Sequence, residues 1–156
     1  RQMCIRDSRG VSKFYAAPGM RLGYGITGNL EFLKKIKEKQ VPWSLNSLGA
    51  LAGELMLKDK DYIHRTRELI LSERNRLLHA LETIPTYKTY PAYANFILLK
   101  IQKTGLSSYD VFDACIRQGL MIRDCSSFEC LDGEYIRFCI MNPEDNTRLL
   151  NILTSL

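Results

Sequence analysis

The amino-acid sequence predicts an α/β protein in two parts, a first part over residues 9–85 and a small α+β domain over residues 86–156. Three observations support this prediction. Apolar residues recur at helical spacing over much of the first part. After Pro85 the pattern changes to the order strand, helix, strand, strand, helix. A chain of 156 residues with 46% hydrophobic residues is also long enough to bury a sizeable core.

The first part is predicted as one short strand followed by three helices. The strand covers 22–27, and Asn29 is the expected N-cap of a helix over 30–40. A second helix is predicted over 46–57 and a third over about 61–84. The third helix has a stripe of apolar residues that we expect to pack in a core or between domains, at Ile63, Ile70, Leu77, Leu81 and Ile84.

The second part is predicted as strand 93–101, helix 108–118, strands 120–124 and 135–141, and a final helix after Asn142. The final helix has the expected start signals, because an asparagine N-cap is followed by a proline and two acidic residues. This order of elements predicts the small α+β domain.

The net charge of +5 and the sequence pI of about 9.0 suggest a nucleic-acid partner as one hypothesis. The most basic run, residues 34–39, also fits the solvated face of a helix whose Leu30, Leu33 and Ile36 point inward. No nucleic-acid motif or interleaved aromatic residue accompanies it, so we expect no nucleic-acid partner. No apolar run approaches the ~18 residues of a membrane span, so we also expect no membrane partner.

The cysteines and histidines do not predict a metal site. The five cysteines are odd in number and form no C-x-x-C motif, so we expect reduced thiols in a cytoplasmic protein. His64 and His79 lie in a helical pattern without a ligand partner at i+4, and we interpret both as structural. We therefore expect no bound metal.

Residues 12–24 read S-K-F-Y-A-A-P-G-M-R-L-G-Y and hold the most informative pattern in the chain. Lys13 precedes Arg21 by eight residues, with Pro18 and Gly19 between them to turn the backbone. A lysine amine condenses with an aldehyde to form a Schiff base, and an arginine binds phosphate through paired hydrogen bonds. Pyridoxal 5′-phosphate (PLP) carries both groups, so one loop that returns on itself could hold it at two points. On these residues alone, a solvated lysine and a turn arginine remain the alternative.

This segment resembles the PLP-lysine segment of class I/II aminotransferases, most of all the branch of threonine-phosphate decarboxylases and histidinol-phosphate aminotransferases. The resemblance covers residues 9–156, as the carboxy-terminal half of an aspartate-aminotransferase-like fold. It implies a remnant of the large parallel-sheet PLP-binding domain, with a bridging helix, before the small α+β domain. It also implies that Lys13 is the Schiff-base lysine, that Arg21 holds the cofactor phosphate and that Ser12 contributes to cofactor binding.

A second pattern places an arginine in each of two apolar strands, within the strings I-R-D-C-S-S-F and Y-I-R. A buried arginine is costly unless an anion pairs with it, and an internal salt bridge to Asp124 or Glu129 would serve as well as a ligand. The strings resemble the substrate-arginine pair of the same branch. The resemblance implies that Arg137 binds the substrate carboxylate and that Arg123 helps to hold the substrate's anionic end, its phosphate.

Two further strings resemble the branch, P-W-S-L-N-S-L from Pro42 and A-N-F from Ala94. By themselves, these residues predict a core aromatic at Trp43 and a helix cap at Asn46. The resemblance adds a role for Asn46 in substrate binding.

The resemblance implies a PLP-dependent enzyme acting on a phosphorylated amino acid, and we favour L-threonine-O-3-phosphate decarboxylase of cobalamin biosynthesis. A histidinol-phosphate-type aminotransferase is the alternative, because breaking a Cα–carboxylate bond or a Cα–H bond calls on the same residues. A non-catalytic or nucleic-acid-binding basic module is the alternative from another class. The resemblance also implies a homodimer for the full-length protein.

The start of the chain departs from the family pattern. Residues 1–8 do not resemble what precedes the lysine, and Gly10 stands where a serine or threonine is expected. We therefore expect 1–8 to be a leader foreign to the family. The acid that pairs with the pyridine nitrogen, the ring-stacking aromatic residue and the glycine-rich phosphate turn are all expected upstream. Without them, we expect the 156-residue chain to be inactive by itself.

Overall fold

The structure is a computed structural model that describes residues 6–156 and divides the chain into two compact units. One unit comprises the described residues up to His64, and the other comprises Arg65–Leu156. Of the expected leader, residues 1–5 lie outside the described part, and residues 6–8 belong to the first strand.

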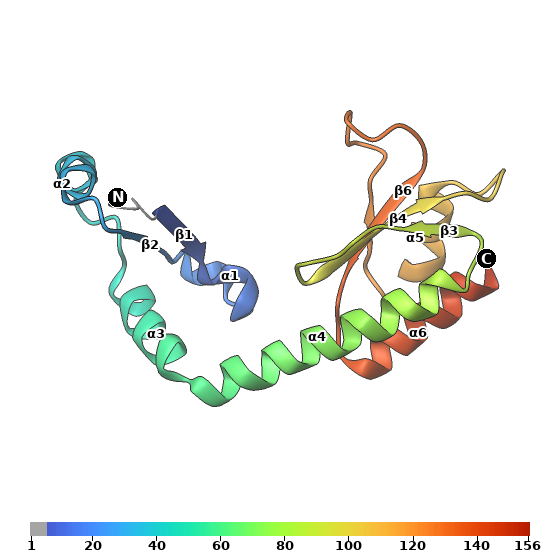
Figure 1. Ribbon diagram of the computed structural model, residues 1–156, viewed down its shortest axis with the longest axis horizontal. Helices are drawn as coiled ribbons and strands as arrows, with labels where there is room; N and C mark the ends of the chain where they lie inside the picture. The colour runs from blue at the N-terminus through green and yellow to red at the C-terminus, as the bar shows by residue number, and fades with distance from the viewer. Residues whose placement is uncertain (1–5) are drawn as a thin grey trace. The chain divides into compact units, whose positions relative to one another are not determined.

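The first unit combines one antiparallel pair of strands with short helices (Figure 1). In chain order its elements are β1 (Arg6–Gly10), α1 (Val11–Phe14), the 3-10 helix η1 (Pro18–Met20), β2 (Gly23–Thr27), α2 (Leu30–Lys39) and α3 (Ser47–Lys58). The described residues of this unit contain no parallel pair of strands.

The β1–β2 pair forms the base from which the first loop projects. Its register runs from Arg6 opposite Thr27 to Gly10 opposite Gly23. A Cβ atom at Gly23 would lie 3.0 Å from the backbone oxygen of Arg9, so glycine permits the close approach of the strands. The sequence analysis predicted β2 but missed β1, because the β1 sequence R-D-S-R-G lacks an apolar alternation.

Asparagine caps fix where α2 and α3 begin, as predicted. The Asn29 Oδ1 atom accepts a hydrogen bond from the backbone N–H of Phe32 at 2.9 Å. The Asn46 Oδ1 atom accepts one from the N–H of Gly49 at 2.6 Å. Each cap satisfies a backbone donor that has no partner within the helix.

Many apolar side chains of the first unit are exposed, which corrects two expectations. Trp43 is 98% exposed, so it is not a core aromatic in this chain. Leu30 is 77% exposed, whereas Leu33 and Ile36 line a groove of about 410 Å³ against β1 and β2. The physical reason is that helical periodicity identifies an apolar face but not whether another element covers it.

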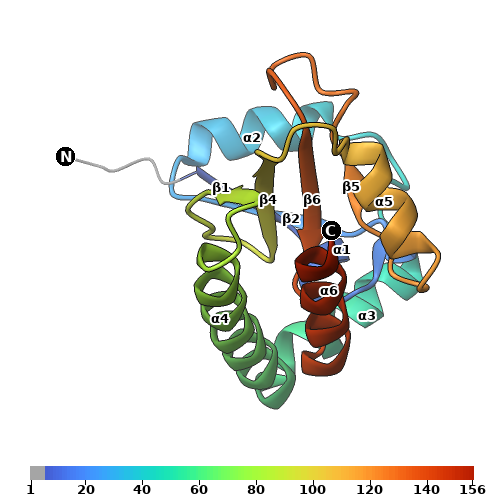
Figure 2. The same ribbon diagram turned by 90° about the vertical axis from the view of Figure 1, so that its right-hand side faces the viewer.

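The second unit is a four-stranded antiparallel sheet in the order β3-β4-β6-β5, with helices packed on one face (Figure 2). It includes most of α4 (Lys60–Glu82), followed by β3 (Tyr87–Thr89), β4 (Phe96–Ile101), α5 (Ser108–Ile116), β5 (Arg123–Asp124), β6 (Tyr135–Cys139) and α6 (Pro143–Ser155). β3 was not predicted and β5 is shorter than expected, because strands of two or three residues carry little pattern.

The core lies between the sheet and the helices. Ile97 of β4 lies opposite Phe138 of β6, and Leu99 lies opposite Ile136, with all four side chains buried. The helices contribute further buried residues to the same cluster: Leu77, Leu81, Val111, Cys115, Leu149, Ile152 and Leu153. Because side chains alternate along a strand, the residues between the buried ones face away from the helices.

The division into units falls within α4 and not after Pro85. Leu77 and Leu81 of α4 are fully buried in the core of the second unit, so this half of the helix packs with that unit. Of the predicted stripe, Ile70 and Ile84 also pack against this core, whereas Ile63 does not belong to it. The assignment of 9–85 to a PLP-binding domain remains a prediction.

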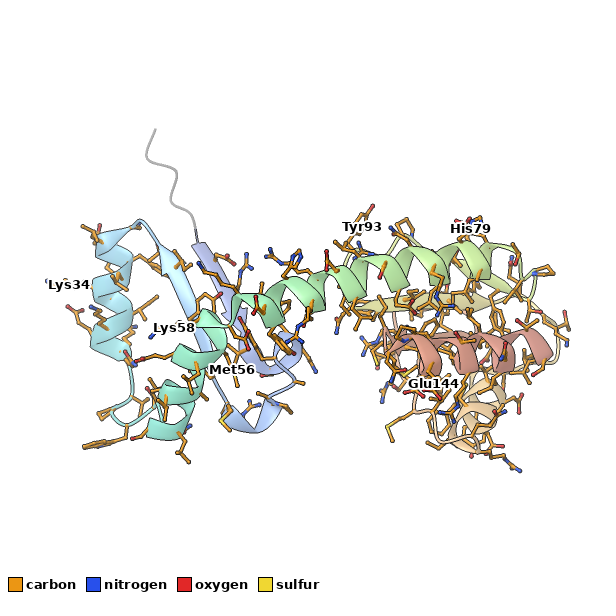
Figure 3. All side chains as sticks on the ribbon, turned by 90° about the horizontal axis from the view of Figure 1, so that it is seen from below. Lys34, Met56, Lys58, His79, Tyr93 and Glu144 are labelled. Atoms are coloured by element: carbon orange, nitrogen blue, oxygen red, sulfur yellow. The ribbon has the colours of Figure 1, made fainter. Side chains whose placement is uncertain are left out.

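A buried polar network joins α4 to α6, which run side by side (Figures 1 and 3). Arg76 donates two hydrogen bonds to the Glu73 carboxylate, Nε to Oε1 at 2.9 Å and Nη2 to Oε2 at 2.7 Å. The fully buried Asn146 donates to Glu73 Oε2 at 2.7 Å and to the Met141 carbonyl oxygen at 2.9 Å. Its Oδ1 atom accepts from the Met141 N–H at 3.0 Å, so this amide also fixes the end of the sheet.

The Glu73 carboxylate should make the stability of the second unit depend on acid pH. The hydrogen bonds from Arg76 hold the pKa of Glu73 below its usual range. The stabilisation is therefore fully present above the ordinary glutamate pKa of about 4.3 and is lost as the pH falls through the lowered pKa. At neutral pH, Glu73→Gln should be less stable by about 1–3 kcal/mol, and this difference should shrink at about pH 3.

Urea unfolding of the 156-residue chain at both pH values would measure the difference in the free energy of unfolding. Amide hydrogen exchange in β4 and β6 would show that the change lies in the second unit. Glu82→Gln, at an exposed position near the end of the same helix, is the matched control. A difference between wild type and Glu73→Gln that is the same at both pH values would contradict the linkage.

Candidate functional site

The Lys13 segment forms a loop that is closed at its base. Gly10 and Gly23 are paired at the end of the β1–β2 ladder, and the Val11 N–H donates to the Leu22 carbonyl oxygen at 3.1 Å. Lys13 lies on α1, just inside this closure, and Arg21 lies at the other end of the loop. The chain therefore returns on itself between the two residues that the sequence singled out.

Backbone hydrogen bonds shape the interior of this loop. The Ala17 N–H donates to the Ser12 carbonyl oxygen at 3.1 Å and tightens the turn after α1. Arg21 follows η1 with a φ of 51°, in the left-handed region that few side chains adopt. Strain of this kind persists only where the surrounding structure enforces it, and it is concentrated at functional sites.

The donors of this loop are largely uncommitted. Among the described residues, the Lys13 amine and the Ser12 hydroxyl have no hydrogen-bond partner, and Lys13 is exposed. The Arg21 guanidinium makes one side-chain hydrogen bond, from Nη1 to the Pro18 carbonyl oxygen at 3.3 Å. Residues 11–22 contain no acid that could neutralise the two cations. The donor set therefore fits an aldehyde and a phosphate group, as PLP would require.

Gly10 leaves this loop with one weakness. It occupies the N-cap position of α1, and no side chain caps the helix there. The serine or threonine expected at this position would have carried a hydroxyl able to cap the first turn. The order of α1 therefore depends on other contacts.

An aromatic cluster supplies one of these contacts, and sequence reasoning missed it. The Tyr62 hydroxyl donates to the Phe14 carbonyl oxygen at 2.9 Å. The Tyr15 and Tyr62 rings are stacked with centroids 5.5 Å apart, and Phe14 lies edge-on to both. The adjacent Phe14 and Tyr15 were visible in the motif, but nothing in the sequence indicated a partner 48 residues away.

Asn46 connects the start of α3 to the same loop. Besides capping the helix, it donates from Nδ2 to the Met20 carbonyl oxygen at 3.4 Å. Asn46 therefore lies beside the residue that precedes Arg21. The cap prediction is confirmed, and a direct role toward a substrate remains a prediction.

The second unit brings the other two predicted residues together. Arg123 of β5 and Arg137 of β6 occupy directly opposite positions of an antiparallel ladder. Both side chains are exposed on the face of the sheet away from the helices, so neither is buried as their apolar strands suggested. Like charges at opposite positions are unfavourable by themselves, which makes the pair a candidate anion site.

Aromatic rings, and not acids, hold these arginines. The Arg137 guanidinium carbon lies 5.1 Å from the centre of the Phe96 ring, and that of Arg123 lies 5.5 Å from the Phe128 ring. Arg123 also donates to the Ser127 hydroxyl at 3.0 Å. Phe96 and Phe128 belong to the A-N-F and S-S-F strings, so the sequence did contain a signal for them.

The alternative of an internal salt bridge is wrong for this pair. Within residues 6–156, neither arginine has a carboxylate oxygen within 4.0 Å, and Glu129 has no ion pair. Asp124 instead accepts hydrogen bonds from the backbone N–H and the hydroxyl of Ser126, both at 2.9 Å. Among the described residues, no close ion pair therefore neutralises Arg123 or Arg137, although Arg123 acts electrostatically on Asp124.

The sequence analysis also considered a metal site, the state of the cysteines and a membrane span, and the described residues bear on each of them. No group of three or more histidine, cysteine or acidic side chains there could hold a metal ion. Cys115, Cys125, Cys130 and Cys139 are free thiols, and Cys4 lies outside the described part. Burial raises the pKa of Cys115 to about 11, so this thiol is protonated at neutral pH.

Helix α4, the longest in the described chain, is too polar to cross a bilayer, and no other described helix could span one.

Comparison with solved structures defines the class of protein. The structure matches the histidinol-phosphate aminotransferase from Clostridium acetobutylicum with a TM-score of 0.84 and 36% identity, over 95% of this chain and 44% of that one. The two units thus have the fold of the carboxy-terminal part of a PLP-dependent transferase. The family model described as aminotransferase class I and II matches residues 8–153, and the chain belongs to that family.

Two curated relatives show which branch the chain resembles. Threonine-phosphate decarboxylase from Salmonella typhimurium is 35% identical over 152 residues, which is 95% of this chain and 41% of the relative. Histidinol-phosphate aminotransferase from Methanothermobacter thermautotrophicus is 31% identical over 148 residues, 95% of this chain and 39% of the relative. The chain therefore spans about two fifths of the length of these relatives.

Proposed function

We propose that this chain is part of a PLP-dependent enzyme that acts on a phosphorylated amino acid or amino alcohol. The observation that carries the proposal is the closed loop between Val11 and Leu22, which holds an uncommitted lysine amine and a nearly uncommitted arginine. Enzymes of the class I and II aminotransferase family use PLP. When bound, PLP supplies an aldehyde carbon and an electron-accepting ring.

The residues of the loop have separate roles in this proposal. The exposed Lys13 amine would hold the aldehyde carbon of PLP, and the same amine could move a proton at the substrate Cα. The Arg21 guanidinium binds the phosphate, with Ser12 adding a hydroxyl donor. The left-handed backbone at Arg21 and the contact from Asn46 to Met20 support the part of the loop that carries this guanidinium.

The arginine pair of the second unit serves the substrate. Arg137 binds its carboxylate and Arg123 its phosphate, and the contacts with Phe96 and Phe128 restrain both side chains. By holding these anions, the pair selects which bond at Cα is cleaved. Asn46 has a secondary role near the substrate.

Within this class we favour L-threonine-O-3-phosphate decarboxylase of cobalamin biosynthesis. The P-W-S-L-N and I-R-D-C-S-S-F strings support it, as does the similarity to the Salmonella typhimurium decarboxylase. A histidinol-phosphate-type aminotransferase is the second candidate, supported by the similarity to the Clostridium acetobutylicum structure. We further propose that the full-length enzyme is a cytoplasmic homodimer and that the 156-residue chain alone does not turn over substrate.

Replacing Arg137 tests the substrate role. In a full-length enzyme that contains this chain, Arg137→Ala should lower kcat/KM by about 10- to 100-fold, because a charge-assisted contact to the substrate is lost. PLP absorbance should be unchanged. Release of carbon dioxide from threonine phosphate, compared with keto product from histidinol phosphate and an amino acceptor, measures both the effect and the reaction type.

The control for this experiment is Arg117→Ala, which removes an exposed arginine that is paired with Asp113. It should leave kcat/KM unchanged. Loss of bound PLP from the Arg137 variant, or full activity in it, would contradict the assignment to substrate. Activity on neither substrate in the wild-type enzyme would contradict the proposed substrate class.

A further inference from the structure

The outer face of the second unit's sheet carries a second pair of like charges. Lys88 of β3 and Lys100 of β4 lie directly opposite each other in the antiparallel ladder. In the neighbouring ladder Lys100 lies opposite Tyr135 of β6, two residues before Arg137. Opposed like charges are unfavourable in a sheet, so a bound anion would stabilise a face that carries two such pairs.

No acid within the described residues provides that compensation by pairing with the lysines. Within residues 6–156, neither ammonium group has a carboxylate oxygen within 4.0 Å. Lys88 Nζ lies 5.5 Å from the centre of the Tyr90 ring, and Lys100 Nζ lies 5.4 Å from that of Tyr135. Lys100 also donates to the backbone carbonyl oxygen of Asp132 at 3.1 Å. These contacts position the ammonium groups without neutralising them.

The two tyrosines add a hydroxyl donor at the same place. The Tyr90 and Tyr135 hydroxyl oxygens are 3.3 Å apart, so one of them donates to the other. The hydroxyl that accepts keeps its own proton free to donate elsewhere. Tyr135 is only 8% exposed, so its ring is fixed by packing. The ends of β3, β4 and β6 on this face thus carry two ammonium groups, each over a tyrosine ring, and one O–H that can donate.

We propose that Lys88, Lys100, Tyr90 and Tyr135 form a second anion-binding site that takes a phosphate group, distinct from the Arg123–Arg137 pair. Two cations and a hydroxyl donor match the several acceptor oxygens of a phosphate. The site stands on its own contacts and does not depend on the proposed PLP chemistry.

One nearby charge works against the site and provides a test. The Asp132 carboxylate is close enough to act electrostatically on Tyr135, yet it forms no ion pair with Lys100. Its side chain does not hold Lys100, because the contact is made by the Asp132 backbone oxygen. Asp132→Asn should therefore tighten phosphate binding while leaving that contact in place.

The experiment is a titration of the 156-residue chain with inorganic phosphate, with chloride at equal ionic strength as the reference. Amide NMR shifts at Lys88, Lys100 and Tyr135 should move together, and Lys100→Met should weaken binding by about tenfold or more. Methionine retains the apolar stem of lysine and removes the ammonium group, with its charge and its hydrogen bond to Asp132. Arg117→Met, which removes one exposed charge elsewhere on the unit, should change nothing.

The outcomes separate the sites and the ligand sources. Asp132→Asn should tighten binding by about threefold, the opposite direction from Lys100→Met. If the Lys88, Lys100 and Tyr135 amides report tighter binding of threonine phosphate than of inorganic phosphate, the ligand is a phosphorylated metabolite, and equal binding at these amides would identify free phosphate. Shifts confined to Arg123 and Arg137, or equal affinities in all variants, would overturn the proposal. If the PLP assignment were wrong, the labelling of Lys13 and the kinetics of the Arg137 variant would show it. Neither residue belongs to the site proposed here.

Discussion

Lys13→Ala should lower the turnover of a full-length enzyme that contains this chain by about 10³-fold or more. Lys13 is the one lysine within residues 11–22, the loop closed by the hydrogen bond from Val11 to Leu22. Its loss removes both the amine that holds the aldehyde and the group that moves the proton. Borohydride reduction of the wild-type enzyme with PLP, followed by peptide mapping, should place the pyridoxyl label on Lys13.

The matched control is Lys34→Ala, which replaces an exposed lysine of α2 in the same unit. It should retain full activity and the label on Lys13. A label on another lysine, or substantial turnover by the Lys13 variant, would refute the assignment. The reductive label does not depend on turnover, so an inactive but correctly labelled enzyme would still support the cofactor site.

Asn146→Ala should produce the largest loss of stability among the variants considered, about 3 kcal/mol or more. The fully buried amide makes three hydrogen bonds, two with the Met141 backbone and one with the Glu73 carboxylate. Alanine would leave the Met141 N–H and carbonyl oxygen without this partner, and Glu73 would keep only its hydrogen bonds from Arg76. The expected result is faster amide hydrogen exchange across β4 and β6 and a lower urea midpoint.

Asn151→Ala is the control, because this asparagine is exposed on the same helix. It should change stability by no more than about 0.5 kcal/mol. Equal stability of the two variants would show that the buried network does not hold α4, α6 and the sheet together. An effect confined to the first unit would contradict the placement of the network in the second unit's core.

Local sequence signals predicted most of the helices and the chemistry of the first loop. The caps at Asn29, Asn46 and Asn142 were correct because each depends on a hydrogen bond to a residue three positions away. The spacing of Lys13 and Arg21, with Pro18 and Gly19 between them, likewise indicated a returning loop. In each case the deciding interactions lie within a short stretch of chain.

Features that depend on contacts between distant segments could not be predicted from the sequence in this way. β3 and β1 were missed because a strand of few residues is defined by its partner more than by its own pattern. Trp43 was expected in a core because its residue type is apolar, yet none of the residues that the structure describes covers it. Burial depends on which other elements are present, and a single segment does not encode that.

The sequence by itself determined the family, the helix starts, the lysine–arginine loop and the two substrate-arginine candidates. Only the tertiary structure decided that Arg123 lies opposite Arg137, that neither pairs with an acid, and that Lys88 and Lys100 form a second pair on the same face. Caps and turns are set by neighbours within a few residues. Strand register instead follows from how the whole hydrophobic face of a sheet is buried, and that face is assembled from segments far apart in the chain.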